Sequence, residues 1–164
     1  MKILIATVIV VLSGFAVASA QVSTAQLSNA EGLGRTVYGI GLAAGPASGI
    51  GVSFRAHLPN KSSFQGIFGI IKTSDKTSLS VGGEYQYDLV RNSTTRFFFG
   101  PAASYFYNGS SHNEIAGPVR IGIGLGGELN VKDVFHVTIE GMYVYASDGS
   151  ILPLPQIAAH YYFY

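Results

Sequence analysis

The sequence predicts an all-β fold in which eight antiparallel strands run up and down and close into a barrel. Apolar and polar residues alternate with a period of two along successive segments, and turn-forming residues interrupt this alternation about every dozen residues. The composition agrees, because 21 glycines, ten tyrosines and ten phenylalanines accompany only ten basic and nine acidic residues in 164. A chain so poor in charge has to hide apolar surface in a core or in a membrane.

The same composition excludes several classes of protein. The length suits one domain, and the apolar content is too high for a disordered chain. The absence of cysteine excludes a disulfide scaffold. The near balance of basic and acidic residues excludes a polybasic protein that binds nucleic acid.

Residues 1–20 are predicted to be a cleavable signal peptide. Lys2 supplies the positive charge, Ile3 to Leu12 is an apolar run broken only by Thr7, and Ala18-Ser19-Ala20 forms an A-x-A cleavage site. An uncleaved anchor helix is the alternative, but a ten-residue run is too short to cross about 30 Å of hydrocarbon. We therefore expect a signal peptide, a short periplasmic segment over residues 21–35, and a barrel domain over residues 36–164.

Eight segments carry the alternation that predicts strands. In chain order they are Thr36 to Ala44, Ile50 to Leu58, Phe64 to Ile71, Ser78 to Leu89, Arg96 to Tyr107, Val119 to Leu129, Phe135 to Tyr145, and Pro155 to the C-terminus. The second, fourth and sixth are the clearest, since each alternates without interruption over about nine to twelve residues. The other five fill the gaps between turns with weaker copies of the same pattern.

The connections alternate between tight turns and other segments. The tight turns are residues 59–62, 90–95 and 130–134, and the others are residues 45–48, 72–77, 108–117 and 146–152. Neither a linker nor a domain boundary is visible.

The polar faces of neighbouring strands should coincide, because residues opposite one another in an antiparallel pair lie on the same side of the sheet. Trial registers for three hairpins satisfy this condition. The expected pairs are Gly39 with Arg55, Asp88 with Arg96, and Glu128 with His136.

The polar face is rich in glycine and carries few charges, so it would make a poor solvated surface. It suits the interior of a narrow barrel, where small residues leave room for larger polar side chains to pair. The predicted polar network of the lumen consists of Arg55, His57, Glu84, Asp88, Arg96, Arg120, Glu128, His136 and Glu140.

The apolar face is then the outer one, with aliphatic residues in the middle of the strands and aromatic residues towards both ends. One aromatic girdle is predicted from Tyr85, Tyr87, Phe97, Phe99, Phe135, Tyr161 and Phe163, and the other from Tyr105, Tyr107, Tyr143 and Tyr145. Two girdles flanking an apolar band are typical of a transmembrane β-barrel, whose strands need about 9 to 11 residues to span the bilayer.

The signal peptide, the eight alternating strands and the aromatic end His160-Tyr161-Tyr162-Phe163-Tyr164 resemble small bacterial outer-membrane β-barrels of the OmpA/OmpX type. The resemblance implies an outer-membrane location, insertion by the barrel-assembly machinery, and outer-membrane lipid as the surroundings of a monomer. It further implies a structural or surface-interaction role, with neither catalytic activity nor a cofactor. The chain departs from the pattern at Tyr164, which falls on the inner-face parity and so lies just past the strand.

Two other functions fit parts of the sequence. A soluble periplasmic lipocalin-like binding barrel would turn the apolar face inward. A lipid-modifying enzyme of the outer membrane would use His136 with Thr138 and Glu140, although threonine stands where the nucleophilic serine is expected. The G-x-G-x-x-G match at residues 122–127 continues the alternation of a strand and lacks the following helix of a dinucleotide site. His136 and Glu140 are about 13 Å apart along a strand, too far to share a metal ion.

Overall fold

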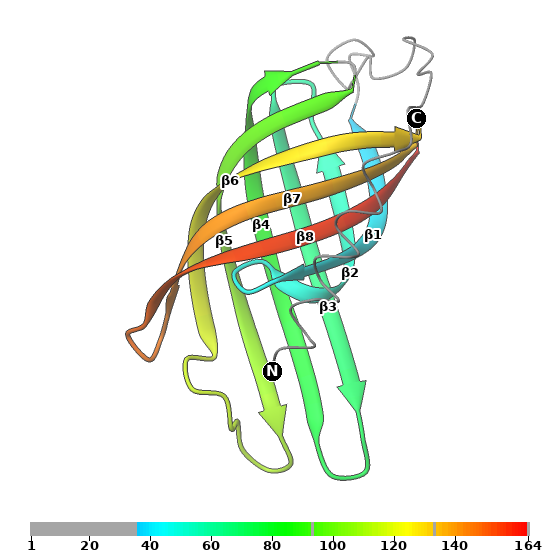
Figure 1. Ribbon diagram of the computed structural model, residues 1–164. Coiled ribbons are helices and arrows are strands. Elements are labelled where there is room, and N and C mark those ends of the chain that lie inside the picture. Colours follow the sequence, from blue (N-terminus) through cyan, green and yellow to red (C-terminus); the bar gives the residue numbers. More distant parts are fainter. Residues whose placement is uncertain (1–35, 93, 133, 164) are drawn as a thin grey trace, which may run out of the picture.

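The computed structural model describes residues 36–92, 94–132 and 134–163, and these form a closed barrel of eight antiparallel strands (Figure 1). The strands are β1 (Val37–Gly45), β2 (Gly49–His57), β3 (Ser62–Lys72), β4 (Thr77–Arg91), β5 (Thr95–Gly109), β6 (Val119–Lys132), β7 (Phe135–Ala146) and β8 (Ile151–Phe163). Each strand pairs with its neighbours in the chain, and β8 pairs with β1 to close the barrel. The eight predicted strands and the fold class are therefore confirmed.

The predicted signal peptide, the segment over residues 21–35 and the position of Tyr164 lie outside the residues that the structure describes. Within those residues, no helix has the length and apolar character needed to cross a membrane.

The two ends of the barrel differ. The first residue of β1 and the last of β8 lie at one end, together with the adjoining ends of β2 and β3, of β4 and β5, and of β6 and β7, and we call this the turn end. The connections 73–76, 110–118 and 147–150 lie towards the opposite end, which we call the loop end, whereas the connection 46–48 stops short of it.

The register of the first hairpin is as predicted, with Gly39 opposite Arg55. The other two are shifted by two residues, so that Asp88 lies opposite Phe98 and Glu128 opposite Thr138. Strands β4 and β6 run further before they turn than the alternation indicates, and a β-bulge interrupts each hairpin beside its turn. A shift of two keeps every side chain on its predicted face.

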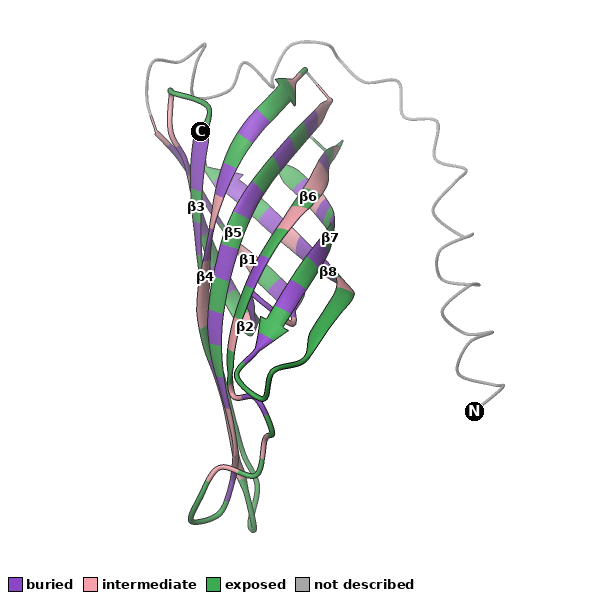
Figure 2. Cartoon of the chain, turned by 90° about the vertical axis from the view of Figure 1, so that its left-hand side faces the viewer, coloured by how far each residue is buried: buried purple, intermediate pink, exposed green. Residues whose placement is uncertain are grey.

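Buried and exposed residues alternate along the strands, as the banding in Figure 2 shows. The exposed positions are apolar, for example Leu42, Ile123 and Leu125, whereas the buried positions hold most of the polar and charged side chains. The apolar face is thus the outer surface and the polar face lines the lumen.

Glycine on the inner face lets strands approach one another closely. A Cβ atom on Gly41 would overlap the carbonyl oxygen of Ala159, and one on Gly124 would overlap that of Gly141. The outward-facing Gly141 has open space where its Cβ would stand. Glycine is therefore required by space on the inner face and not at this outer position.

The connection between β1 and β2 turns into the lumen instead of continuing the wall. Ala47 is 0% exposed and packs with Ala102, Met142 and Val144 from β5 and β7. The turn leaves the lumen at Gly49, whose φ of 112° favours glycine. We call Pro46–Ser48 the inner turn; Figure 1 shows β3, β4 and β5 continuing well past it towards the loop end.

The glycine requirement is testable with Gly124→Ala and Gly141→Ala, which alter neighbouring strands on opposite faces. We expect Gly124→Ala to lower the free energy of unfolding by about 1 to 3 kcal/mol, because the new methyl group meets backbone. Gly141→Ala should leave stability unchanged or raise it by up to about 1 kcal/mol. Urea unfolding from detergent micelles measures both, and equal effects would contradict the assignment of the two faces.

Candidate functional site

Arg55 lies at the centre of a polar cluster inside the barrel. Its guanidinium is 0% exposed and donates from Nη1 to Glu128 Oε2 at 2.5 Å and to Thr138 Oγ1 at 3.0 Å. Nε donates to Gln65 Oε1 at 2.8 Å. Strands β2, β3, β6 and β7 are therefore joined through one side chain.

Arg96 extends this cluster towards the turn end. It donates to Glu128 Oε2 and to Asp88 Oδ1, each at 3.1 Å, and it also contacts the Gln86 side chain. Asp88 forms a second ion pair with Arg91. Asp88 and Arg96 are thus partners through a diagonal contact, although they do not face one another in the register.

Three aromatic or imidazole rings pack beside the two arginines. His57 Nε2 lies 2.7 Å from the hydroxyl oxygen of Tyr162, and the rings of His136 and Tyr162 have centroids 4.5 Å apart. His136 Nδ1 is 2.7 Å from Glu128 Oε1. Glu128 consequently contacts two arginines and a histidine.

Two carboxyl groups, Glu84 and Glu140, lie further towards the loop end and share two amide donors. Gln156 Nε2 donates to Glu84 at 3.0 Å and to Glu140 at 2.8 Å. Gln86 Nε2 donates to Glu84 at 2.7 Å. Because Gln86 also contacts Arg96, this pair belongs to the same continuous network.

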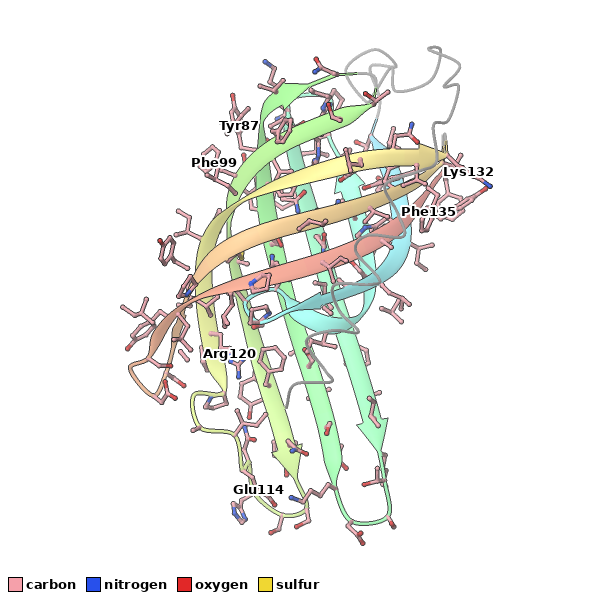
Figure 3. All side chains as sticks on the ribbon, viewed as in Figure 1. Tyr87, Phe99, Glu114, Arg120, Lys132 and Phe135 are labelled. Atoms are coloured by element: carbon pink, nitrogen blue, oxygen red, sulfur yellow. The ribbon has the colours of Figure 1, made fainter. Side chains whose placement is uncertain are left out.

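The structure brings eight of the nine predicted lumen residues together and places Arg120 apart. The residues in the network are Arg55, His57, Glu84, Asp88, Arg96, Glu128, His136 and Glu140. Arg120 is half-buried near the loop end, where its guanidinium carbon is 4.5 Å from the centre of the Phe106 ring (Figure 3). Its assignment to the network is corrected: it shares the parity of Glu128 but stands eight residues away, about 27 Å along a strand.

Several members of the network were not predicted from the sequence. Apart from His160, their side chains are uncharged at neutral pH, and the prediction was built on charged residues and histidines. The members that were not predicted are Ser53, Ser63, Gln65, Gln86, Thr138, Gln156, His160 and Tyr162. All lie on the buried face of their strands, so the parity of the alternation was the signal that could have found them.

The residues assigned to the girdles lie on the outer surface. Tyr87 and Phe99 pack edge to face near the turn end, with ring centroids 5.9 Å apart, and Figure 3 labels both. Tyr143 and Tyr145 are exposed towards the loop end. Tyr85 and Tyr107 are half-buried, and the Tyr85 hydroxyl is 2.9 Å from Ser62 Oγ.

The network contains serine–histidine contacts, and the residues that form them are buried. Ser53 Oγ is 2.8 Å from His160 Nε2, and both residues are 0% exposed. Thr138, the nucleophile of the enzyme alternative, is equally buried and is hydrogen-bonded to Arg55. Over residues 36–163, apart from positions 93 and 133, no group of three histidine, aspartate or glutamate side chains is placed to hold a metal ion. The arrangement pairs charges and fills space.

An exposed ion pair joins two connections at the loop end. Lys76 Nζ is 2.5 Å from Glu114 Oε2, and the hydrogen bond from Lys76 lowers the pKa of the Glu114 carboxyl. At the neighbouring connection, hydrogen bonds from Ser150 lower the pKa of Asp148. Both carboxyl groups are charged at neutral pH.

No family model and no curated protein sequence matches the chain. Among solved structures, it is similar to the crystal structure of Neisserial surface protein A, with 15% identity and a TM-score of 0.42, over 77% of this chain and 91% of that one. It is also similar to the outer-membrane protein Ail of Yersinia pestis in a phospholipid bilayer nanodisc, with 15% identity and a TM-score of 0.41, over 78% of this chain and 98% of that one. The barrel fold of this chain rests on its own strand pairing.

The central ion pair is testable with Arg55→Met, which keeps an unbranched stem and removes the charged guanidinium. We expect a loss of about 3 to 5 kcal/mol in the free energy of unfolding, because a buried carboxylate loses a partner. The double variant Arg55→Met with Glu128→Gln should recover part of this loss. Urea unfolding from micelles checks both, and a single variant as stable as the parent would show that the pair contributes nothing.

The loop contact should depend on pH. The pKa of Glu114 is lowered from its ordinary value of 4.5. The stabilisation that the ionised Glu114 gives to the loop contact is therefore complete above pH 4.5 and disappears as the pH falls through the lowered pKa. A nitroxide on Ser110→Cys, the sole cysteine of the variant, should become more mobile between about pH 6 and about pH 3. Glu114→Gln should give the mobile spectrum at both pH values. A spectrum of the parent that does not change with pH would refute the contact.

Proposed function

We propose that this chain is an integral β-barrel protein of the bacterial outer membrane, with a structural or surface-interaction role and without catalytic activity. The observation that supports the proposal most strongly is the inverted polarity of the barrel. Its charges lie inside, as with the fully buried Arg55, while its aliphatic side chains lie outside, as with Ile123 at 57% exposure.

A continuous apolar exterior suits hydrocarbon and is rare on soluble monomers. Along β6, for example, the outward-facing positions from residue 121 to residue 129 are Ile, Ile, Leu, Gly and Leu. A bilayer also requires that the backbone N–H and C=O groups pair within the protein. The closed barrel meets this requirement, because every strand has a neighbour on both sides and the wall has no edge over its central part.

Strand lengths agree with this location. The shortest strands, β1 and β2, have 9 residues, and the remaining six have 11 to 15. About 9 to 11 residues cross a bilayer. Strands β4 and β5, with 15 residues each, therefore extend beyond it, and Figure 1 shows them projecting at the loop end together with β3.

We assign the turn end to the periplasm and the loop end to the cell exterior. Both ends of the described barrel lie at the turn end, as expected if the barrel-assembly machinery inserts the chain from the periplasm. The loop end then presents the projecting strands and the Lys76–Glu114 pair to the surroundings. Surface contacts of the protein would be made there, by a monomer held in outer-membrane lipid.

The two alternative functions have less support. A soluble lipocalin-like barrel needs an apolar lumen, whereas the lumen here holds an extended polar network. A lipid-modifying enzyme needs a nucleophile that reaches the outer leaflet, whereas Thr138 is fully buried.

Ile123→Arg separates a membrane barrel from a soluble one. In hydrocarbon the arginine should cost up to about 2 to 4 kcal/mol of stability, because the residue is the fifth of the 14 residues of β6 and faces outward. In water the same exposed arginine would be tolerated. The free energy of unfolding in lipid vesicles measures the cost, and Ile123→Leu is the matched control.

Electrophoresis with and without boiling tests the location independently. The detergent-extracted chain should migrate as a compact species that loses its anomalous mobility on heating. Recovery of the protein wholly in the soluble periplasmic fraction, together with an unaffected Ile123→Arg variant, would reject the proposed function.

A further inference from the structure

Among the residues that the structure describes, the wall of the barrel is incomplete near the loop end, where two strand edges have no neighbour. Strand β8 pairs with β1 only from Ile157 onwards, so its residues 151–156 lack a partner on that side. Strand β3 pairs with β2 only as far as Phe68. The cause is the early end of β1 and β2, whose connecting inner turn enters the lumen.

The free edge of β8 is protected from pairing by its sequence. Pro153 and Pro155 lie opposite Tyr143 and Gly141 of β7, and proline has no N–H to donate. Since alternate residues of a strand direct N–H to the same side, these two prolines occupy positions whose N–H would point away from β7, towards the missing β1. The edge therefore offers few donors, and a strand from a second copy of the chain would gain little by pairing with it.

Apolar side chains of the inner face are uncovered at this gap. Leu152 lies opposite the buried Val144 and thus on the inner face, yet it is 52% exposed. Leu154, two residues further along, is half-buried and packs against the cluster around Ala47 of the inner turn. Leucines on an inner face are exposed here because β1 does not cover them.

A cation stands near these leucines on the same face. Leu152 of β8 lies opposite Val144 of β7, which in turn lies opposite Gly122 of β6. Arg120 is two residues nearer the loop end than Gly122 on the same strand. The register separates the backbones of Leu152 and Arg120 by about 7 Å along the strands and about 10 Å across two of them. Arg120 stacks on Phe106 and donates weakly to the Gly117 carbonyl oxygen at 3.4 Å. Of the ion pairs found among the described residues, none includes Arg120.

We propose that this gap binds one acyl chain of an anionic lipid of the surrounding membrane, with the lipid phosphate at Arg120. The chain would enter from the side between β8 and β3 and lie against Leu152 and Leu154, above the inner turn. The proposal rests on the membrane location of the barrel. An anionic lipid fits because uncovered leucines lie near a guanidinium that forms no ion pair among the described residues and interacts with the Asp148 carboxylate only at longer range.

The absence of tryptophan from the chain permits a single-tryptophan experiment. Leu152→Trp reports on the gap, and Leu42→Trp, on the outer surface of β1, reports on general contact with lipid. Each variant is placed in nanodiscs of phosphatidylcholine that contain increasing fractions of phosphatidylglycerol with brominated acyl chains, which quench tryptophan on contact.

We expect quenching at residue 152 to saturate at low fractions of the brominated lipid, and quenching at residue 42 to rise in proportion to that fraction. Adding Arg120→Gln should raise the fraction needed at residue 152 by about tenfold, since a charge-assisted contact to phosphate is lost. The same change should leave residue 42 unaffected, and Lys72→Gln, at an exposed lysine, should affect neither.

Proportional quenching at residue 152 with no effect of Arg120→Gln would overturn the lipid site and leave the membrane location intact. Absence of quenching at both residues would overturn the membrane location, and the lipid site with it. A disulfide-linked dimer of Leu152→Cys, the sole cysteine of that variant, would assign the gap to a second copy of the chain and likewise overturn the proposal. If Leu152→Trp does not fold, Leu154→Trp provides the same readout.

Discussion

The buried charge of Arg55 is the interaction on which the interior depends. A guanidinium without access to water is tolerated only where each donor has an acceptor, and here the acceptors come from β3, β6, β7 and β8. The requirement fixes how these strands approach one another around the lumen. It also explains Gln65, whose Oε1 accepts from Arg55 without adding charge. Gln86 and Gln156 serve the neighbouring carboxyl groups in the same way, since both donate to Glu84.

The glycines of the inner face make room for the charged side chains of the lumen. An eight-stranded barrel has an interior just wide enough for side chains, so long polar residues fit only where other inner positions are vacant. Gly39 illustrates this: its missing Cβ leaves space for the ring of Tyr162, whose hydroxyl reaches His57. The filled, paired lumen makes the centre rigid and leaves the two ends as the parts that can interact.

The alternation in the sequence was sufficient to predict all eight strands and the face of each side chain. It was insufficient for the register of β4–β5 and β6–β7, because the bulges beside Asp88 and Asn130 leave no mark in a two-residue pattern. The displaced Arg120 shows a related limit, since parity assigns a face but not a depth along the barrel. The inward course of Pro46–Ser48 was also not predicted, because its burial depends on glycines of distant strands such as Gly82 and Gly122.

The early end of β1 and β2 also has a consequence for how the barrel comes apart. Their hairpin is joined to β3 by six residue pairs and to β8 by seven, whereas every other pair of adjacent strands shares at least nine. Opening free energies within a protein follow the local density of such contacts. By backbone pairing alone, the β1–β2 hairpin is the most weakly held part of the wall. The hydrogen bonds of Arg55, on β2, to side chains of β3, β6, β7 and β8 tie this hairpin to the remaining six strands.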